Sequence, residues 1–378
     1  MSTSLIATKG YIAPEVEAAS RRAYELCQQV GETPQLFSAV GRLQSLYLNR
    51  AELKTARELA EQLLRLAQET GKPRSLLWAH YALGFTLTRQ GEFSAARAHL
   101  EQSIALYDPQ RHRLSDFVQD PRVTGLALLA HDLLLLGYPD QALQRSQEAL
   151  TLARQLAHPY SLAWVLDSVA GIRRRQGEPQ AAQALTEEFI ALTRKQDFTH
   201  MLTMQVFQQG WDLVERGRGE EGIAQMRQGL AALQTTRDVF ARLGGLWMLA
   251  EAYGEVGQPE EGLNVLGEAM ALLNKTEARD EAADLYWLQG ELLLQSKAQD
   301  PKAEEEAEAC LHKAIEIARQ QQAKLLELQA VMSLARLWQQ QGRKSEAHRM
   351  LAEIYAWFTE GFDTKDLQEA KALLDGLA

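Results

Sequence analysis

Residues that could do chemistry are scattered through this sequence and are not grouped at the spacings that catalysis or metal binding needs. The eight histidines do not cluster, and no two lie four residues apart as they do in the H-E-x-x-H zinc motif. Pairs such as His80 with Glu101, or His131 with Asp132, also lack a metal-ligand spacing. We therefore expect no metal site, and we assign no catalytic residue.

One short segment has the form of a nucleotide-binding loop. The stretch GRGEEG, Gly217 to Gly222, fits G-x-G-x-x-G, the glycine pattern that cradles a dinucleotide when it follows a strand. No strand is predicted before it, and it falls on a turn of the repeat described below. The phosphate-binding pattern G-x-x-x-x-G-K-[ST] does not occur in the sequence. We therefore interpret the segment as a structural turn, expect no cofactor, and do not expect an enzyme.

Composition narrows the class of protein. The formal net charge is −10 and the pI is about 5.4, whereas a nucleic-acid-binding chain would be expected to carry a basic stripe. Cys27 and Cys310 are the only cysteines, and each lies beside a leucine, so we interpret both as packing residues in a reducing compartment. No signal peptide or apolar run of membrane length is present. We therefore expect a cytoplasmic protein that binds neither nucleic acid nor membrane.

The residues from Leu249 to Leu273 predict a helical hairpin. Apolar residues leading up to Tyr253 recur at i, i+3, i+4 and i+7, the spacing of a helix with one buried face. Gly257 can end this helix in the left-handed conformation, and Pro259 is well placed to open the next one. Gly262 in the second helix would let the two backbones approach closely.

This hairpin recurs along the chain at a nearly fixed period. The turn glycine reappears as Gly91, Gly137, Gly177, Gly217, Gly257 and Gly342. With three weaker copies, the equivalent anchor positions are Val16, Ala56, Ala96, Ala142, Ala182, Gly222, Gly262, Ala307 and Ala347, separated by steps of 40, 40, 46, 40, 40, 40, 45 and 40. A repeat of this size is typical of stacked units that bury their apolar faces against their neighbours. Because strong helix formers dominate and no period-two alternation appears, we predict an all-α solenoid without strands.

The repeat also predicts the organisation of the chain. We expect residues 1–378 to form a single solenoid, with 1–30 as a truncated first repeat, 31–358 as eight helical hairpins and 359–378 as a C-terminal capping helix. Asp108 to Pro121 is predicted to be a loop, and Ser296 to Glu306 a longer turn inside one hairpin. Since an open repeat end exposes an apolar face, we expect the chain to be an excised fragment or to follow another segment.

The repeated residues resemble tetratricopeptide repeats. The resemblance rests on a small residue at the eighth position (Gly84, Gly210, Gly290), a large one at the eleventh (Tyr47, Tyr253, Trp338), and alanines at the twentieth and twenty-seventh (Ala142 with Ala149, Ala307 with Ala314). Tetratricopeptide repeats are about 34 residues long, so each helix here should be longer. The resemblance implies a right-handed superhelix of hairpins with a period of about 40 residues.

A narrower resemblance covers almost the whole chain. Segments such as LIATKGYIAPEVEAA, GYPDQALQRSQEAL and YAWFTEGFDTKDLQEAKALL are similar to the C-terminal repeat region of bacterial multidomain proteins. In those proteins a class III adenylate or guanylate cyclase domain and a STAND or AAA-type ATPase domain precede the repeats. The resemblance implies a non-catalytic sensor or regulatory module of a bacterial signalling ATPase or cyclase. The alternative is a stand-alone scaffold that binds partner peptides.

The tetratricopeptide resemblance also predicts a binding surface. In such arrays, four positions of each first helix line a concave groove, and five of the seven tryptophans fall at these positions here. The predicted groove residues are Trp78, Tyr81, Phe85, His131, Trp164, Asp167, Phe207, Trp211, Trp247, Glu251, Trp287 and Glu291. Large aromatic side chains on a concave wall can anchor a peptide or stack on a ligand. The alternative is that longer helices rotate these residues into the core between repeats.

We expect the partner to be a protein or peptide. A small-molecule effector, and self-association through an uncapped N-terminal repeat, are further alternatives that the sequence leaves open.

Overall fold

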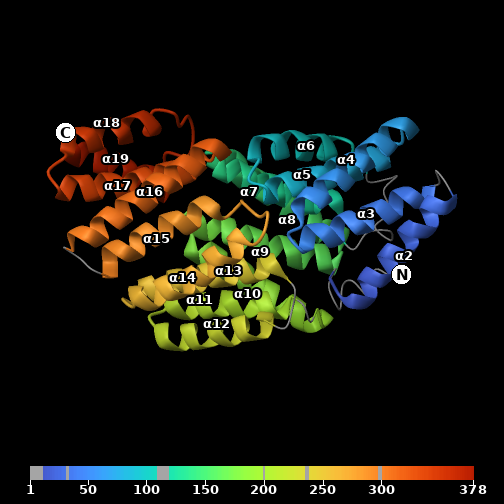
Figure 1. Cartoon of the computed structure of the whole chain (residues 1–378), viewed down its shortest axis with the longest axis horizontal. Coiled ribbons are helices and arrows are strands. Elements are labelled where there is room, and N and C mark those ends of the chain that lie inside the picture. The colour runs from blue at the N-terminus through green and yellow to red at the C-terminus, as the bar shows by residue number, and fades with distance from the viewer. Residues whose placement is uncertain (1–11, 31–33, 109–118, 199–200, 235–237, 297–299) are drawn as a thin grey trace.

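The structure is a computed structural model that describes residues 12–30, 34–108, 119–198, 201–234, 238–296 and 300–378. Within these ranges every regular element is a helix, and no strand is present. The helices are α2 (Pro14–Val30), α3 (Pro34–Asn49), α4 (Leu53–Thr70), α5 (Pro73–Arg89), α6 (Phe93–Ala105), α7 (Pro121–Leu135), α8 (Pro139–Leu156), α9 (Pro159–Arg175), α10 (Pro179–Gln196), α11 (Leu202–Glu215), α12 (Gly219–Gln234), α13 (Val239–Glu255), α14 (Pro259–Asn274), α15 (Ala282–Ser296), α16 (Pro301–Gln321), α17 (Lys324–Gln340), α18 (Lys344–Tyr355) and α19 (Lys365–Leu377). Figure 1 shows them as hairpins stacked along a winding path.

Tight glycine turns join the two helices of most hairpins. All six predicted turn glycines have a positive φ, between 74° and 90°, a conformation that glycine adopts without a steric cost. At the α13–α14 turn, Gln258 N donates to Tyr253 O at 2.8 Å, and Pro259 occupies the first turn of α14. The turn prediction is therefore confirmed, and with it the antiparallel arrangement of each pair.

Small residues let the paired helices approach closely. A Cβ atom at Gly222 of α12 would lie 2.4 Å from the carbonyl oxygen of Gly210 on α11. At Gly84 and Gly290 an added Cβ would lie within 3 Å of leucine side chains on the second helix of the same hairpin. These contacts leave no room for a larger side chain, which explains the small residues of the repeat.

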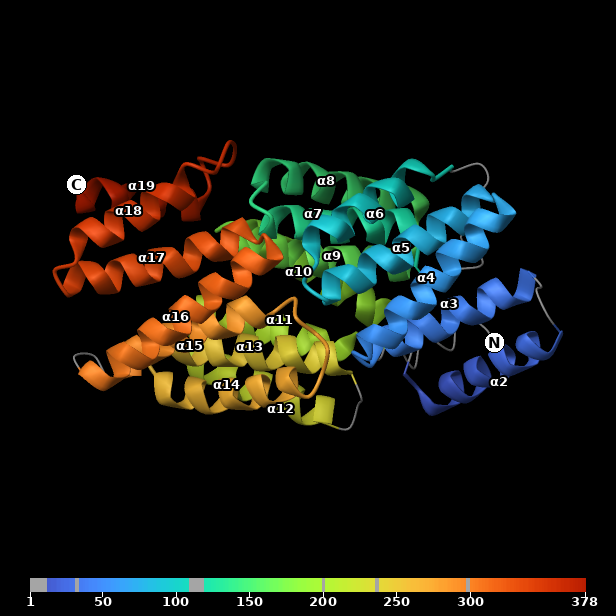
Figure 2. The same ribbon diagram turned by 45° about the horizontal axis from the view of Figure 1, so that its top comes forward.

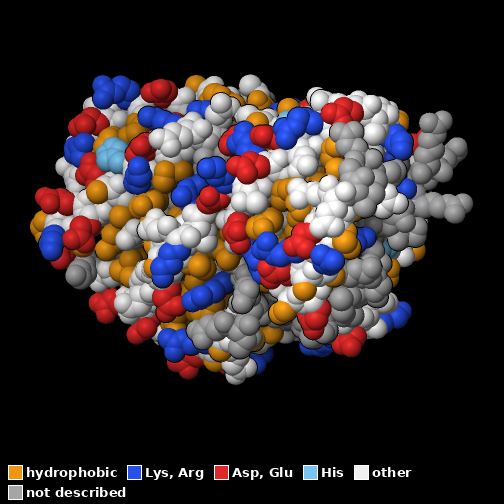
Figure 3. Space-filling model, turned by 45° about the vertical axis from the view of Figure 1, so that its right-hand side comes forward, with side chains coloured by type: hydrophobic (Ala, Val, Ile, Leu, Met, Phe, Trp, Pro, Cys, Tyr) orange, Lys and Arg blue, Asp and Glu red, His pale blue; other side chains and the backbone are white. Residues whose placement is uncertain are grey.

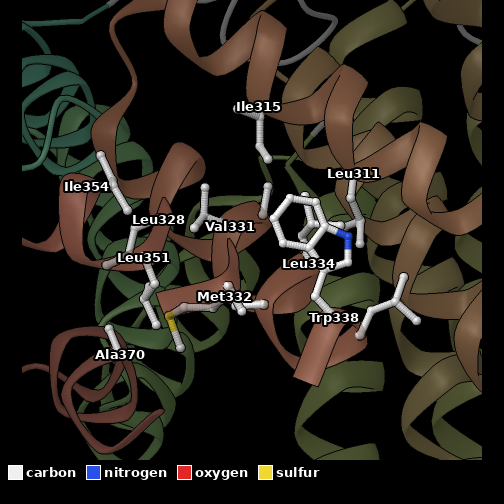
Figure 4. Close-up of a cluster of buried hydrophobic side chains, with 14 of the residues drawn as sticks. Leu311, Ile315, Leu328, Val331, Met332, Leu334, Trp338, Leu351, Ile354 and Ala370 are labelled. Atoms are coloured by element: carbon white, nitrogen blue, oxygen red, sulfur yellow. The ribbon is translucent and has the colours of Figure 1, made fainter. Parts of the chain in front are cut away.

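The hydrophobic core continues from one hairpin to the next. At its C-terminal end, Leu311 of α16, Leu334 and Trp338 of α17, Leu351 of α18 and Ala370 of α19 belong to one buried cluster. Figure 4 shows these side chains converging from several helices. The C-terminal capping helix predicted within 359–378 is α19, Lys365–Leu377, and its Leu367, Ala370 and Leu377 belong to this cluster.

The superhelix winds far enough for hairpins that are distant in sequence to touch. We call this contact the turn-to-turn interface; it includes the pairs Gly91 with Gln321, Gly137 with Trp357, and Gly177 with Lys365. Figures 1 and 2 both show α17 and the α18–α19 connection beside one end of α7 and α8.

Hydrogen bonds reinforce the turn-to-turn interface. Glu360 Oε1, between α18 and α19, accepts bonds from the backbone N–H groups of Asp140 and Gln141 at 3.0 and 3.1 Å. These amides lie at the N-terminus of α8, where a carboxylate is favoured by the helix dipole. The Trp357 ring also packs edge-on against Tyr138, with centroids 5.5 Å apart. The interface is therefore both polar and aromatic.

Two predicted boundaries are wrong. Ser296 to Glu306 was predicted to be a turn, but α16 already begins at Pro301, where Asp300 caps it by accepting from Lys302 N. Pro301 lies six residues before its anchor Ala307, whereas Pro259 lies three before Gly262, so much of the insertion lengthens α16. The last hairpin was predicted to reach Phe358, but α18 ends at Tyr355.

Other predicted segments fall partly outside the described ranges. Most of the predicted loop from Asp108 to Pro121 lies there, and α7 begins at Pro121 with Asp120 as its cap. Residues 1–11 of the predicted truncated repeat also lie outside the described part of the chain.

The surface is mixed in charge. Figure 3 shows lysine, arginine, aspartate and glutamate side chains interspersed with hydrophobic ones on the face that it presents. Among the described residues, none of the helices combines the length and the apolar character needed to cross a membrane.

A glycine substitution tests the close approach of paired helices. Replacing Gly222 with alanine should lower the free energy of unfolding by about 1–3 kcal/mol, because the new methyl group meets the backbone of α11. As a matched control, Gly267→Ala in α14 meets nothing within 4 Å and should stabilise the protein by about 0.5–1 kcal/mol. Chemical denaturation of both variants measures the two changes. Equal stabilities would contradict the packing described for α11 and α12.

Candidate functional site

Side chains from four first helices and one connection meet inside the superhelix. The Phe85 ring of α5 and the Trp164 ring of α9 lie edge-on, with centroids 6.4 Å apart. Arg175, at the end of α9, lies 5.6 Å from the ring centroid of Trp247 on α13. Arg89, at the end of α5, lies 4.3 Å from the ring centroid of Phe240, also on α13. We call this region the interior.

Two ion pairs cross the interior between distant parts of the chain. Arg89 Nη1 donates to Asp280 Oδ2 at 2.6 Å, and Arg175 Nη1 donates to Asp284 Oδ1 at 2.8 Å. The side chains of Asp280 and Asp284 are only 4% and 5% exposed. These pairs attach the α14–α15 connection and α15 to the ends of α5 and α9.

The connection from Lys275 to Glu281 places the acidic residues. Val239 and Arg279 are equivalent positions, one repeat of 40 residues apart. Val239 is the first residue of α13, whereas Arg279 lies before the start of α15 at Ala282. The unwound backbone is held by Arg279 N, which donates to Arg89 O at 2.9 Å, and by Arg279 O, which accepts from Gln321 Nε2 at 2.6 Å. As a result, Asp280 and Glu281 face the interior.

The predicted groove residues divide into two groups. Tyr81, Phe207 and Trp211 are 5%, 0% and 7% exposed and belong to the hydrophobic core. Phe207 is enclosed by Gly229 and Gly245, where an added Cβ would come within about 3 Å of its ring. These three residues therefore lie in the core, as the alternative to a groove predicted.

The remaining predicted residues are half-buried. Phe85, Trp164, Trp247 and Glu251 are brought together with Arg89 and Arg175 in the interior. Asp167 is nearby and accepts a bond from Gln208 at 3.1 Å.

Four predicted residues lie apart from this group or make other contacts. Trp78 packs against Tyr81, and Trp287 donates to Ser333 Oγ at 3.0 Å. His131 contacts Asp132 and the Phe93 ring, and Glu291 lies one helical turn beyond Trp287. A binding role for any of the twelve residues stays a prediction.

Sequence reasoning missed five interior residues: Arg89, Arg175, Asp280, Glu281 and Asp284. Arg89 and Arg175 precede turn glycines by two residues, where a basic residue is common for reasons of the helix dipole. Only the superhelical winding brings them to the acidic connection, so no local signal marks them.

Burial controls the electrostatics of the interior. It raises the pKa of Glu251 to about 7 and that of Asp167 to about 6. Burial also raises the pKa of Glu281, and the adjacent Asp280 adds to this effect. The cost of desolvation therefore exceeds the stabilisation that the nearby arginines give to these carboxylates.

Several polar atoms of the interior have no partner. Among the residues that the structure describes, Arg89 Nε, Trp247 Nε1, Asp280 Oδ1 and Glu281 Oε2 are buried and make no hydrogen bond. Buried polar atoms in folded proteins are usually paired. These four are among fourteen such side-chain atoms in the described part of the chain, and they are available to polar groups from outside the chain.

The described residues do not gather metal-binding side chains at one place. Within those ranges, no group of three or more His, Cys, Asp or Glu side chains could hold a metal ion. His80 and His99 lie with their Nδ1 atoms 2.9 Å apart, a pair that forms a hydrogen bond between α5 and α6. The GRGEEG segment joins two helices, α11 and α12, which confirms its interpretation as a structural turn.

A hollow also lies on the outside of the solenoid. This open groove of about 620 Å³ runs between α11 and α12, where Val206 and Leu213 face small residues such as Ala224 and Gly229. Glu221 is its one charged lining residue among those described, so the groove lacks the convergent charges of the interior.

Comparison with known proteins identifies the fold. The tetratricopeptide repeat family matches residues 41–108, and no curated protein matches the sequence. The structure of a Rap protein complexed with Competence and Sporulation Factor superposes with a TM-score of 0.64 at 12% identity, covering 100% of this chain and 97% of that one. NprR in complex with its cognate peptide NprX gives 0.55 at 16% identity, covering 82% and 89%.

A third solved structure shows how widely the fold is used. The human IFIT1 dimer with PPP-AAAA has a TM-score of 0.50 at 16% identity, covering 96% of this chain and 78% of that one. At these identities the comparisons show the fold alone: an all-α, right-handed solenoid of tetratricopeptide-like hairpins.

The raised pKa of Glu251 predicts a pH-dependent stability. Because the folded chain holds this proton up to about pH 7 and the unfolded chain releases it near its ordinary pKa of 4.5, stability should fall as the pH rises from about 4.5 to 7. The charged groups around Glu251 are Arg175, Glu255, Asp284 and Arg174. Glu251→Gln has no group to titrate here and should not lose stability over this pH range. The difference in free energy of unfolding between this variant and the parent chain should therefore be larger at pH 8 than at pH 5, by an amount of order 1–3 kcal/mol.

Thermal or chemical unfolding at the two pH values measures this difference. Glu268→Gln, an exposed residue of α14, is the matched control and should show no such change. The same offset for Glu251→Gln at both pH values would contradict the burial of this carboxyl.

Proposed function

We propose that this chain is a non-catalytic regulatory module that binds a peptide, or an extended segment of a protein, in the interior of its superhelix. The observation that carries this proposal is the interior itself. Half-buried rings of Phe85, Trp164 and Trp247 lie beside charged groups that include buried polar atoms without partners among the described residues. Aromatic anchors next to oriented polar groups are what a peptide needs from a binding site.

The comparisons support this class of ligand. NprR has been solved with its cognate peptide, and a Rap protein with Competence and Sporulation Factor. Both share the solenoid arrangement with this chain. IFIT1 shares it too and was solved with PPP-AAAA, so the ligand class for this chain rests on the interior residues and not on the fold.

The turn-to-turn interface favours a sensor over a passive scaffold. The ion pairs that cross between the two superhelical turns are formed by Arg89 and Arg175. Both arginines also border the interior. A ligand that altered these pairs would change how the two superhelical turns pack, and this gives binding a structural effect at a distance. On the resemblance of its sequence, the module would regulate a bacterial signalling ATPase or cyclase; a stand-alone scaffold would need no such coupling.

Peptide selection tests the proposal. A library of random linear peptides is displayed on phage and selected on the whole chain, and the best sequence is then synthesised and titrated by fluorescence anisotropy. Trp247→Ala should weaken its binding by about 30-fold or more, about 2 kcal/mol, because this ring is an interior anchor.

Trp338→Ala is the matched control. This ring lies under Arg343 of the α17–α18 turn, 4.2 Å from its Cζ, and its Nε1 bonds Glu308. The control should lose about 3–5 kcal/mol of stability yet keep its affinity at a temperature where both variants are folded. Failure to select any peptide, or equal affinity losses in the two variants, would contradict the proposal.

A further inference from the structure

We propose that the interior binds an organic cation, a guanidinium or ammonium group of its ligand, on the acidic cluster formed by Glu251, Asp280, Glu281 and Asp284. The inference rests on the proposed function for the location of the site and adds the chemistry of the ligand. It makes a basic peptide the expected partner, and it predicts that acidic peptides are rejected.

The first observation is an imbalance of charge. Seven carboxylates face the interior arginines: Asp167, Asp238, Glu251, Asp280, Glu281, Asp284 and Asp366. The cations that face them are Arg89, Arg174, Arg175 and, beside Asp366, Lys365. Arg174 is also 3.9 Å from a further carboxylate, that of Asp212. Like charges at close range in a desolvated site repel strongly. Where these carboxylates are charged, the interior has fewer cations than anions, and a positively charged ligand would correct the balance.

The second observation is independent of the charge count. Asp280 is 4% exposed, and its Oδ1 atom is buried without a hydrogen-bond partner among the described residues, as is Oε2 of Glu281. Glu281 lies against α13, since a Cβ at Gly244 would be 3.8 Å from its Oε1 atom. In its charged form a carboxylate oxygen only accepts, so in that form these atoms are satisfied by a donor. Guanidinium and ammonium groups provide several donors each.

The third observation is that the chain already binds guanidinium groups here in a consistent way. Arg175 pairs with Asp284 and lies over the Trp247 ring. Arg89 pairs with Asp280 and lies over the Phe240 ring. Each arginine thus combines a carboxylate with an aromatic face, the two partners that favour a guanidinium most. Glu251 and Glu281 are carboxylates of the same region, and neither forms an ion pair with another described residue.

The raised pKa values of Glu251 and Glu281 support the same conclusion. Burial raises both, and a bound cation would favour their charged forms. A metal ion is a poorer fit, since no three candidate ligands converge among the described residues. Phosphate groups would be repelled by the carboxylates.

Two sources could provide the cation, a basic side chain of a peptide or a free polyamine, and three probes separate them. The probes are tri-arginine blocked at both ends, blocked tri-glutamate, and spermidine, each titrated into the whole chain by calorimetry at pH 8 and low salt. Tri-arginine should bind with one site and tri-glutamate should not bind. Spermidine binding as tightly as tri-arginine would identify the free polyamine as the better ligand, whereas weaker binding would favour the peptide.

Variants locate the site. Glu251→Gln and Glu281→Gln should each weaken tri-arginine binding at least tenfold, and Glu251→Gln is expected to fold at least as well as the parent chain. Glu268→Gln, exposed on α14, should leave the affinity unchanged, which excludes general attraction to a chain of net charge −10. Equal losses in all three variants, or no binding of either cation, would overturn the proposal.

The outcome is distinguishable from failure of the proposed function. If phage selection yields peptides that bind through Trp247 but lack lysine and arginine, the peptide-binding function stands and the cation site falls. If spermidine binds through Glu251 while no peptide is selected, the cation site stands and the peptide-binding function falls.

Discussion

The contact between successive turns of the superhelix is the constraint on which the interior depends. In most solenoids each repeat touches only its neighbours, but here Arg89 reaches Asp280, 191 residues away, and Arg175 reaches Asp284, 109 residues away. The turn glycines Gly91, Gly137 and Gly177 allow the second turn to approach, because side chains there would collide with Gln321, Trp357 and Lys365.

This contact buries the acidic side chains of the interior, since Asp280 and Asp284 are each only 4% exposed. Burial desolvates the carboxylates and raises their pKa values, and it leaves polar atoms without partners among the residues that the structure describes. Buried ion pairs often add little net stability because desolvation offsets their attraction. We therefore interpret Arg89–Asp280 and Arg175–Asp284 as fixing how the two turns are placed, which also makes that placement sensitive to a bound charge.

The features that were predicted from the sequence are those set by interactions within a single hairpin. The turn glycines, the period and the presence of a C-terminal helix follow from capping and from apolar spacing, which act within one hairpin. Part of the Ser296 to Glu306 stretch was misplaced because a charged run that follows Asp-Pro also suits the first turns of a helix, as α16 shows.

The interior could be predicted only in part. Trp247 and Glu251 were selected from their repeat positions, whereas Phe207 and Trp211, chosen by the same rule, lie in the core. Whether such a residue faces the interior or the core depends on the rotation of its helix about the helix axis. The longer helices of this repeat change that rotation. Arg89 and Asp280 could not be paired at all, because their contact depends on the pitch of the whole superhelix.

Hydrogen–deuterium exchange with the selected peptide tests the central claim most directly, that the ligand is bound inside the superhelix. The account predicts slower exchange in the 275–281 connection and at the ends of α5 and α9 when peptide is bound, because these backbones surround the interior. Slower exchange confined to α11 and α12, which line the outer groove, with the connection unchanged, would contradict it.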